Sequence, residues 1–306
     1  MTSKYSIKDL ERLSGIKAHT IRIWEQRYNL LNPDRTGTNI RLYNDDELKY
    51  VLNIASLIRA GGKISHIVKL NKQEITKRIQ ELVESPVKVD SFFETQTDNL
   101  VIAMLELDEL MFEKAINTSS LKYGFEETML NVIIPFLQKV GIMWRTGDAS
   151  IIQEHFISNL IRKKVLVAID GYIGNVAPDA EHWLLYLPEG ELHEVGLLFS
   201  KYLLKVRGKK VMYFGQTVPV NDIMAYCKSY NPKYILTFFT AAYSKDGIVS
   251  YLNKLAEEIK NTEILVAGGQ VCGWKPEWPN VRFLSVITDL IEIAGPVYPQ
   301  KSIRIA

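Results

Sequence analysis

The 306-residue sequence is poor in cysteine and has no long hydrophobic segment. Its two cysteines, Cys227 and Cys272, could form at most one bridge, so disulfides do not organise the fold. There is no apolar run of the roughly 18 residues that a transmembrane helix needs, and the N-terminus lacks the apolar stretch of a signal peptide. We therefore expect a cytoplasmic protein that contacts no membrane. Its length predicts two or three domains.

Two nucleotide-binding signatures are also missing. The sequence contains neither the dinucleotide glycine fingerprint nor a phosphate-binding loop, which makes nicotinamide cofactors and nucleoside triphosphates poor candidates. The net charge is only +2, but it is unevenly distributed. Residues 1–75 hold 13 Lys and Arg against 8 Asp and Glu, whereas the remainder holds 24 against 27. A basic first quarter indicates contact with a polyanion, although such a run is often only solvated surface.

The first segment has short helical patterns broken by turn residues. Ser6 can cap a helix that ends at Gly15, and a second helix is predicted over residues 17–27, which together indicate a helix-turn-helix. Residues 33–39 have turn chemistry and precede an alternating strand, as expected for a β-wing. Asp45 or Asp46 should cap the helix that follows.

The order of these elements resembles the MerR family of regulators. The matching segments are Ser6–Leu10, Gly15–Glu25 and Arg41–Leu48. The resemblance implies that the second helix enters the major groove of double-stranded operator DNA, where phosphate contacts give salt-dependent affinity and base contacts give sequence choice. The candidate DNA-binding residues are Lys17, His19, Thr20, Arg22, Arg27, Arg35, Arg41 and Tyr43. The alternative is a small helical domain with merely solvated arginines.

One feature departs from the metal- and drug-sensing MerR regulators, which dimerise through a long helix after the winged domain. Ser85-Pro86-Val87 should stop a helix that begins near Ile75, because proline lacks a backbone donor and disfavours helix before it. We therefore expect dimerisation to be arranged differently.

The rest of the chain divides into a helical segment and an alternating one. Helical periodicity over residues 98–116, 126–144 and 149–170, with short connections, predicts an antiparallel helical bundle. Residues 182–295 alternate short apolar runs with amphipathic ones, which predicts a Rossmann-like, flavodoxin-like parallel sheet. The predicted domains are therefore a winged helix-turn-helix over residues 1–75, a bundle over 76–180 and an α/β domain over 181–306.

Polar and small residues cluster after the predicted strands, where the ligand of such a sheet binds. After the first strand, His193 is a possible cobalt ligand whose other ring nitrogen could donate to Glu191, and Gly196 removes a side chain beside the ligand path. Each of the next three predicted strands contributes candidates as well, namely Gly215, Thr237, Gly268 and Gly269.

This set resembles the cobalamin-binding domains of methionine synthase, the carbon-skeleton mutases and corrinoid methyl carriers. The resemblance implies that His193 is the lower axial cobalt ligand and that Thr237, Gly268 and Gly269 line the slot for the displaced cobalamin base. In the middle element of the motif, Thr237-x-Phe239 stands where the family has Ser-x-Leu. The hydroxyl is kept, whereas the larger Phe239 could narrow the slot.

The bundle carries a second constellation, Trp144 followed after nine residues by Glu154-His155. With the domain order, it resembles the light-sensing MerR-type repressors of the CarH and LitR kind. The resemblance implies that Trp144, Ile151, Glu154 and His155 face the upper side of adenosylcobalamin. In such photosensors the residue after the tryptophan is a histidine that ligates cobalt after illumination, whereas Arg145 stands here and is no ligand.

These features predict a cobalamin-dependent, light-responsive transcription regulator, a repressor that is not an enzyme. By the resemblance, adenosylcobalamin controls operator binding by stabilising a homo-oligomer, a tetramer when the cofactor is bound. The alternatives are a cobalamin-binding regulator without a light response, a regulator with a vestigial pocket, and a corrinoid methyl carrier or enzyme subunit.

Overall fold

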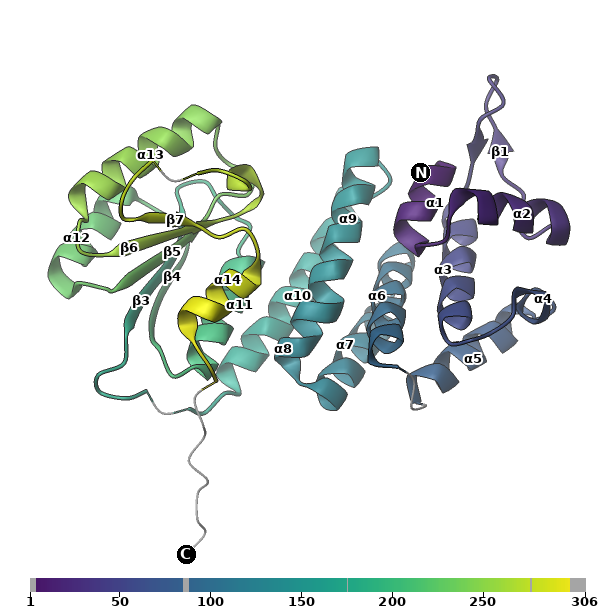
Figure 1. Ribbon diagram of the computed structural model, residues 1–306, viewed down its shortest axis with the longest axis horizontal. Coiled ribbons are helices and arrows are strands. Elements are labelled where there is room, and N and C mark those ends of the chain that lie inside the picture. The colour runs from purple at the N-terminus through teal and green to yellow at the C-terminus, as the bar shows by residue number, and fades with distance from the viewer. Residues whose placement is uncertain (1–3, 85–87, 175, 276, 298–306) are drawn as a thin grey trace, which may run out of the picture. The chain divides into compact units, whose positions relative to one another are not determined.

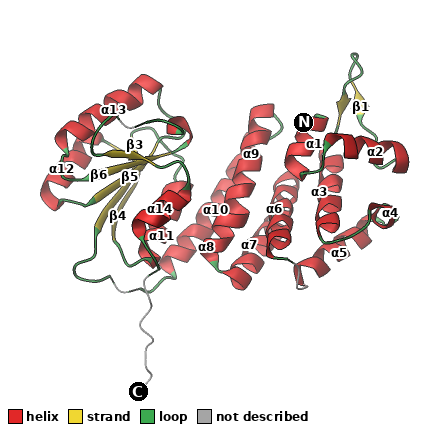
Figure 2. Cartoon of the chain, in the orientation of Figure 1, coloured by secondary structure: helices red, strands yellow, loops and turns green. Residues whose placement is uncertain are grey.

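The computed structural model describes residues 4–84, 88–174, 176–275 and 277–297. The chain divides into two compact units, residues 1–160 and 161–306, which are described separately (Figure 1). Among the described residues, no helix has the length and apolar character needed to span a membrane. Figure 2 shows that helices dominate the first unit and that the second combines helices with a sheet.

The first unit begins with a winged helix-turn-helix. Its elements are α1 (Ile7–Ser14), α2 (Ala18–Tyr28), β1 (Asp34–Arg35), β2 (Arg41–Leu42), α3 (Asp45–Arg59), α4 (Ile64–Ile67) and α5 (Lys72–Glu84). The predicted capping role of Ser6 is confirmed, because its Oγ accepts from the backbone N–H of Asp9 and the Asp9 carboxylate accepts from that of Ser6. The cap of α3 is Asn44 rather than Asp45 or Asp46.

The core of this domain extends beyond the predicted boundary at residue 75. Trp24 of α2 and Ile54 of α3 pack in one buried cluster with Ile75 and Ile79 of α5. The boundary therefore falls inside α5, whose apolar face completes the winged-domain core. The predicted stop at Ser85-Pro86-Val87 lies outside the described residues.

The bundle follows as four helical stretches. They are α6 (Val89–Glu106), α7 (Glu109–Tyr123), α8 (Phe125–Thr128) leading through the π-helical turn Met129–Ile133 into α9 (Ile134–Thr146), and α10 (Ile151–Asp170). The prediction of one helix over residues 98–116 is wrong. Leu107 adopts a left-handed conformation with φ 53°, and the Asp108 carboxylate caps α7 by accepting from the backbone N–H of Met111 at 2.9 Å.

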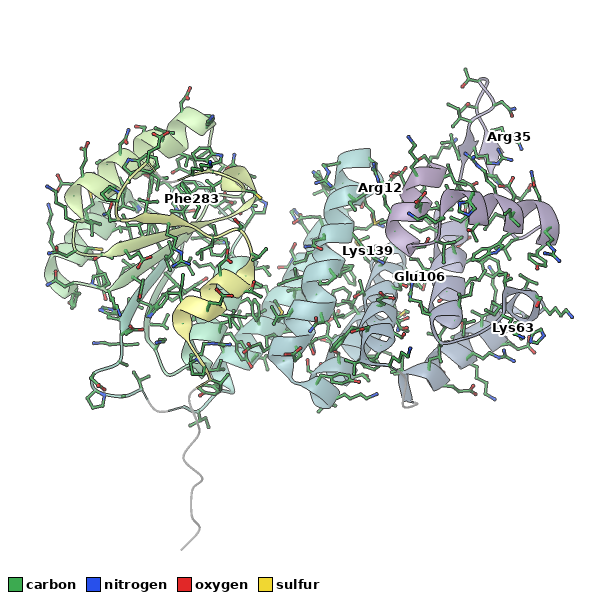
Figure 3. The ribbon with its side chains drawn as sticks, in the orientation of Figure 1. Arg12, Arg35, Lys63, Glu106, Lys139 and Phe283 are labelled. Atoms are coloured by element: carbon green, nitrogen blue, oxygen red, sulfur yellow. The ribbon has the colours of Figure 1, made fainter. Side chains whose placement is uncertain are left out.

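A buried carboxylate joins the winged domain to the bundle. Asp98 of α6, whose side chain is only 2% exposed, accepts from Lys139 Nζ at 2.6 Å and pairs with the guanidinium of Arg59 at the end of α3. Lys139, labelled on α9 in Figure 3, also donates to the carbonyl oxygen of Leu13 in α1 at 2.6 Å. Two cations from different domains thus share one buried anion.

The second unit is a parallel α/β domain. Its elements are β3 (His182–Pro188), α11 (Val195–Val206), β4 (Lys210–Val218), α12 (Val220–Tyr230), β5 (Tyr234–Phe238), α13 (Lys245–Glu258), β6 (Glu263–Ala267), β7 (Val281–Phe283) and α14 (Ile287–Ala294). The strand order β4-β3-β5-β6-β7 is the flavodoxin-like order, so the predicted fold class is confirmed. Helices α11 and α14 cover one face of the sheet and α12 and α13 the other (Figure 1). The strand order reverses between β3 and β5, which places the ligand crevice at their carboxyl ends.

Candidate functional site

A buried carboxylate organises the crevice between β3 and β5. Glu191 is fully buried, and its Oε2 accepts from the backbone N–H groups of Thr240 and Ala241 at 2.9 and 3.0 Å. Its Oε1 accepts from the backbone N–H of Leu192 and from His193. Although burial opposes ionisation, the hydrogen bonds from Ala241, His193 and Thr240 lower the pKa of Glu191 to about 2. The group is therefore a carboxylate at neutral pH.

That carboxylate fixes the orientation of the His193 imidazole. His193 Nδ1 lies 2.6 Å from Glu191 Oε1, and because a carboxylate only accepts, Nδ1 must carry the proton. The other ring nitrogen, Nε2, makes no hydrogen bond in the described part of the chain. The side chain is 54% exposed. An oriented and accessible imidazole with one nitrogen unengaged can bind a transition metal through that nitrogen.

Replacing Glu191 with glutamine tests this arrangement. The groups around Glu191 are all N–H donors, and the NH2 group of a glutamine would face some of them without an acceptor. We therefore expect a loss of about 1–3 kcal/mol in the free energy of unfolding. The His193 tautomer would also lose its partner, and cobalt affinity should fall about 10- to 100-fold. Urea unfolding and cobalamin titration measure the two effects, and wild-type values in both would contradict the role assigned to Glu191.

The pH dependence of the wild type has a defined sign. The pKa of Glu191 falls from 4.5 to about 2 on folding, so the ionised group stabilises the fold above pH 4.5. This contribution is lost as the pH falls from 4.5 toward 2.

The slot predicted behind the histidine contains one buried hydroxyl and has one open side. Thr237 of β5 is fully buried, and its hydroxyl lies close to that of Tyr186, which pairs with the Tyr251 hydroxyl at 2.8 Å. A Cβ added to Gly268 would lie 2.2 Å from the carbonyl oxygen of Phe239, whereas one added to Gly269 would meet nothing within 4 Å. The open space at Gly269 leaves room for part of a ligand.

The three remaining residues of the cobalamin motif have different surroundings from those expected. Gly215 lies inside β4 rather than after it, at a register irregularity and with φ 78°. A Cβ on Gly196 would lie 2.9 Å from the ring of Phe238, so this glycine allows the ring to pack closely against α11. Phe239 is fully buried and packs edge-on against Tyr243 at 5.2 Å, within the core.

Sequence reasoning missed a polar cluster beside the histidine. Glu194, one residue after His193, is buried, pairs with the Arg162 guanidinium of α10 and accepts from the Tyr213 hydroxyl at 3.0 Å. The partners are 32 and 19 residues away in the sequence, so no local pattern could reveal them. The cluster fixes the start of α11, and with it the segment that carries His193.

The residues predicted to face the upper side of the cofactor lie on adjacent helices of the first unit. Trp144 in α9 is 48% exposed, and Ile151 at the start of α10 is also exposed. Glu154 accepts from the Ser158 hydroxyl at 3.0 Å and pairs with His155 Nδ1 at 2.7 Å. Exposed Trp and Ile are apolar surface available to a ligand or partner. Their contact with the cofactor stays a prediction.

The predicted DNA-reading helix presents a charged surface. Lys17, His19, Arg22 and Arg27 are exposed on or next to α2, with Thr20 partly exposed between them. Arg35 lies on the β1–β2 wing, where its guanidinium donates to Asn39 Oδ1 at 2.7 Å (Figure 3). A helix and a wing that both present exposed cations suit the DNA duplex.

The surroundings of two predicted DNA-binding residues, Tyr43 and Arg41, differ from those expected. Tyr43 is fully buried, exchanges backbone hydrogen bonds with Tyr5, and donates from its hydroxyl to Glu25 at 3.3 Å, so it supports the wing and does not contact DNA. Arg41 also binds Glu25, with Nε 2.9 Å from Oε1. Glu25 therefore ties strand β2 to helix α2.

Two protein families match this chain. Residues 5–74 match the MerR HTH family of regulatory proteins, and residues 96–168 match the B12 binding domain family, in the helical bundle. Together with the flavodoxin-like sheet, these matches define the chain as a MerR-type, cobalamin-binding transcription regulator.

Its relatives narrow the class further. The chain is 26% identical to the HTH-type transcriptional repressor CarH of Myxococcus xanthus over 87% of this chain and 88% of CarH. It is equally identical to CarA of the same organism, over 86% and 85% of the two chains. The Methanosarcina barkeri monomethylamine corrinoid protein has a similar fold, with a TM-score of 0.51 and 14% identity over 65% of this chain and 96% of that one. The chain thus resembles CarH and CarA, which are both HTH-type transcriptional repressors.

Proposed function

We propose that this regulator is a repressor whose binding to operator DNA is controlled by adenosylcobalamin. In this proposal His193 binds cobalt from below, and the slot with Thr237, Gly268 and Gly269 receives the displaced base. Trp144, Ile151, Glu154 and His155 enclose the adenosyl group. The cofactor promotes a homo-oligomer, a tetramer in its full form, that presents several winged domains to DNA.

The observation that carries the proposal is the hydrogen bond between Glu191 and His193 Nδ1. It leaves Nε2 without a hydrogen bond in the described residues, on the segment that follows the carboxyl end of β3. His193 is half-exposed with one nitrogen fixed by a carboxylate, which is the arrangement that a metal-binding histidine requires.

The control of DNA binding follows from linkage. A bound cofactor shifts an assembly equilibrium only if it binds the assembled state more tightly than the dissociated one. Several winged domains on one assembly gain avidity, because after the first binds, the others bind at a high effective concentration. Dissociation removes this gain, so loss of the cofactor should release the operator.

The light response depends on the residue beside Trp144. When bound, adenosylcobalamin supplies a cobalt–carbon bond that light breaks. Arg145 is exposed and permanently charged, so it cannot replace the lost ligand. We therefore propose that light releases the oligomer without creating a second histidine ligand. The second candidate is a regulator that binds cobalamin without responding to light. Arg145 favours it, because the photosensors have at this position the histidine that ligates cobalt after illumination.

Reconstitution tests the proposal directly. The purified chain is loaded in the dark with adenosylcobalamin, methylcobalamin or hydroxocobalamin, and its absorption spectrum and size-exclusion volume are recorded. We expect all three to bind and only the adenosyl form to produce the larger species, which illumination should dissociate. Failure of every form to bind would refute cobalamin control, and a light-insensitive oligomer would select the second candidate.

Substitution of two arginines, Arg22 and Arg41, distinguishes a residue that contacts DNA from one that supports the wing. Arg22→Ala removes one exposed cation, so operator affinity should fall and the slope of log K against log salt should flatten by about 1. Arg41→Ala removes the ion-pair partner of Glu25 and leaves it only the Tyr43 hydroxyl, so it should also destabilise the winged domain. Fluorescence anisotropy at several salt concentrations and thermal unfolding measure both. Unchanged affinity in Arg22→Ala would refute the docking of α2.

A further inference from the structure

A cavity of about 480 Å³ lies within the first unit, between two elements of the winged domain and two of the bundle. Helices α3 and α5 form one wall and α6 and α7 the other. Its size falls within the range of small-molecule sites. It contains none of the residues proposed to bind cobalamin or DNA.

One buried donor in the cavity wall has no acceptor. Gln96 of α6 is 1% exposed, and its Nε2 makes no hydrogen bond in the described part of the chain. A buried unpaired amide donor costs about 1–3 kcal/mol, so its retention needs a reason. An oxygen atom brought by a ligand would satisfy it.

The acidic side chains around the cavity have partners, whereas two of its lysines have none in the described residues. The acids on its rim already have partners, because Asp46 and Glu106 both pair with Lys49, at 2.7 and 2.9 Å, and Asp108 caps α7. In contrast, the exposed ammonium groups of Lys72 and Lys114 make neither a hydrogen bond nor an ion pair in the described residues. The three acids and three lysines of the lining balance in charge, but these two ammonium groups remain available to an anion.

Apolar side chains form part of the wall, beside polar ones such as Asn53, Asn99 and Thr118. Ile75 and Ile79 of α5 face Ile102 of α6 and Ala115 of α7 across the cavity, and all four side chains are buried. A ligand that fits these groups has an apolar body and an acceptor-rich, anionic head.

We propose that this cavity is a second effector site, which binds an amphipathic carboxylate. The carboxylate accepts from Gln96 Nε2 and faces Lys72 and Lys114, and the apolar body lies against the isoleucines. Such a ligand contacts the winged domain and the bundle together. It therefore adds an input to the regulator that is independent of cobalamin.

Calorimetric titration of the full chain with decanoate, below its micellar concentration, tests the proposal. Decan-1-ol, which has the same apolar chain and no charge, is the matched ligand. We expect decanoate to bind about tenfold more tightly than decanol, since a hydrogen bond to a charged group contributes more than one to a neutral group. Both the cofactor-free and the hydroxocobalamin-loaded chain should give this result, so the outcome does not depend on the cobalamin proposal.

Substitutions of cavity residues test whether decanoate binds in the cavity. Lys72→Gln/Lys114→Gln should remove the preference for decanoate, whereas Lys63→Gln/Lys69→Gln, which changes two exposed lysines outside the cavity, should retain it. Gln96→Leu should weaken decanoate binding about tenfold without lowering the melting temperature of the free chain, because it removes an unsatisfied donor. No decanoate binding, or equal binding by wild type, Gln96→Leu and the Lys72/Lys114 variant, would overturn the site.

Discussion

Replacement of His193 by alanine is expected to weaken cobalamin binding by about 100-fold or more and to change the absorption spectrum of any cofactor that remains bound. His193 is the imidazole at the β3–β5 crevice, and its Nε2 is the nitrogen left free by the hydrogen bond to Glu191. Without it, the proposed cobalt ligand is removed. The measurement is a titration of the variant with hydroxocobalamin, followed by absorption.

Two controls make this result specific. His182, at the start of β3, pairs with the Tyr226 hydroxyl at 3.2 Å and lies at the opposite end of the strand from the crevice. His182→Ala should therefore bind cobalamin with the wild-type spectrum. Added imidazole should restore part of the axial spectrum in His193→Ala. If His193→Ala binds with unchanged affinity and spectrum, His193 is not the cobalt ligand.

Replacement of Asp98 by alanine should produce the largest loss of stability in the first unit. Removal of the buried anion leaves Arg59 and Lys139, both mostly buried, without their shared partner. Removing one partner of a buried ion pair costs about 3–5 kcal/mol. Because these cations come from α3 and α9, the loss should also loosen the winged domain from the bundle.

Hydrogen exchange locates this effect. Amides of α3, α6 and α9 should exchange faster in Asp98→Ala than in the wild type, while those of β3, β5 and β6 in the second unit serve as an internal reference and should not change. The matched control is Glu94→Gln on the same helix, which changes an exposed acid beside Arg59 and should cost less than about 1 kcal/mol. Equal exchange in both variants would show that Asp98 does not join the two domains.

The elements that could be predicted from the sequence are those fixed by local patterns. Sequence patterns predict a helix over residues 220–230 and a strand over residues 234–239. Helix α12 has the predicted bounds, and β5 differs from its prediction only at Phe239. The Ser6 cap is equally local. The break at Leu107 was missed because apolar periodicity continues across it, although Asp108 was a readable N-cap.

The parts that could not be predicted depend on distant partners. Tyr43 looked like a wing residue open to DNA, but its burial depends on Tyr5 and Glu25, 38 and 18 residues away in the sequence. In the same way, Asp98 lies between cations 39 and 41 residues away. The Glu191–His193 pair was predictable because its members are two residues apart, and its predicted hydrogen bond is present in the structure.

The most direct test of the account is the operator affinity of one protein preparation in three states: without cofactor, loaded with adenosylcobalamin in the dark, and loaded and then illuminated. The account predicts tight binding only in the dark, loaded state, with affinity falling toward that of the cofactor-free chain after illumination. Equal affinity in all three states would contradict control of this regulator by cobalamin.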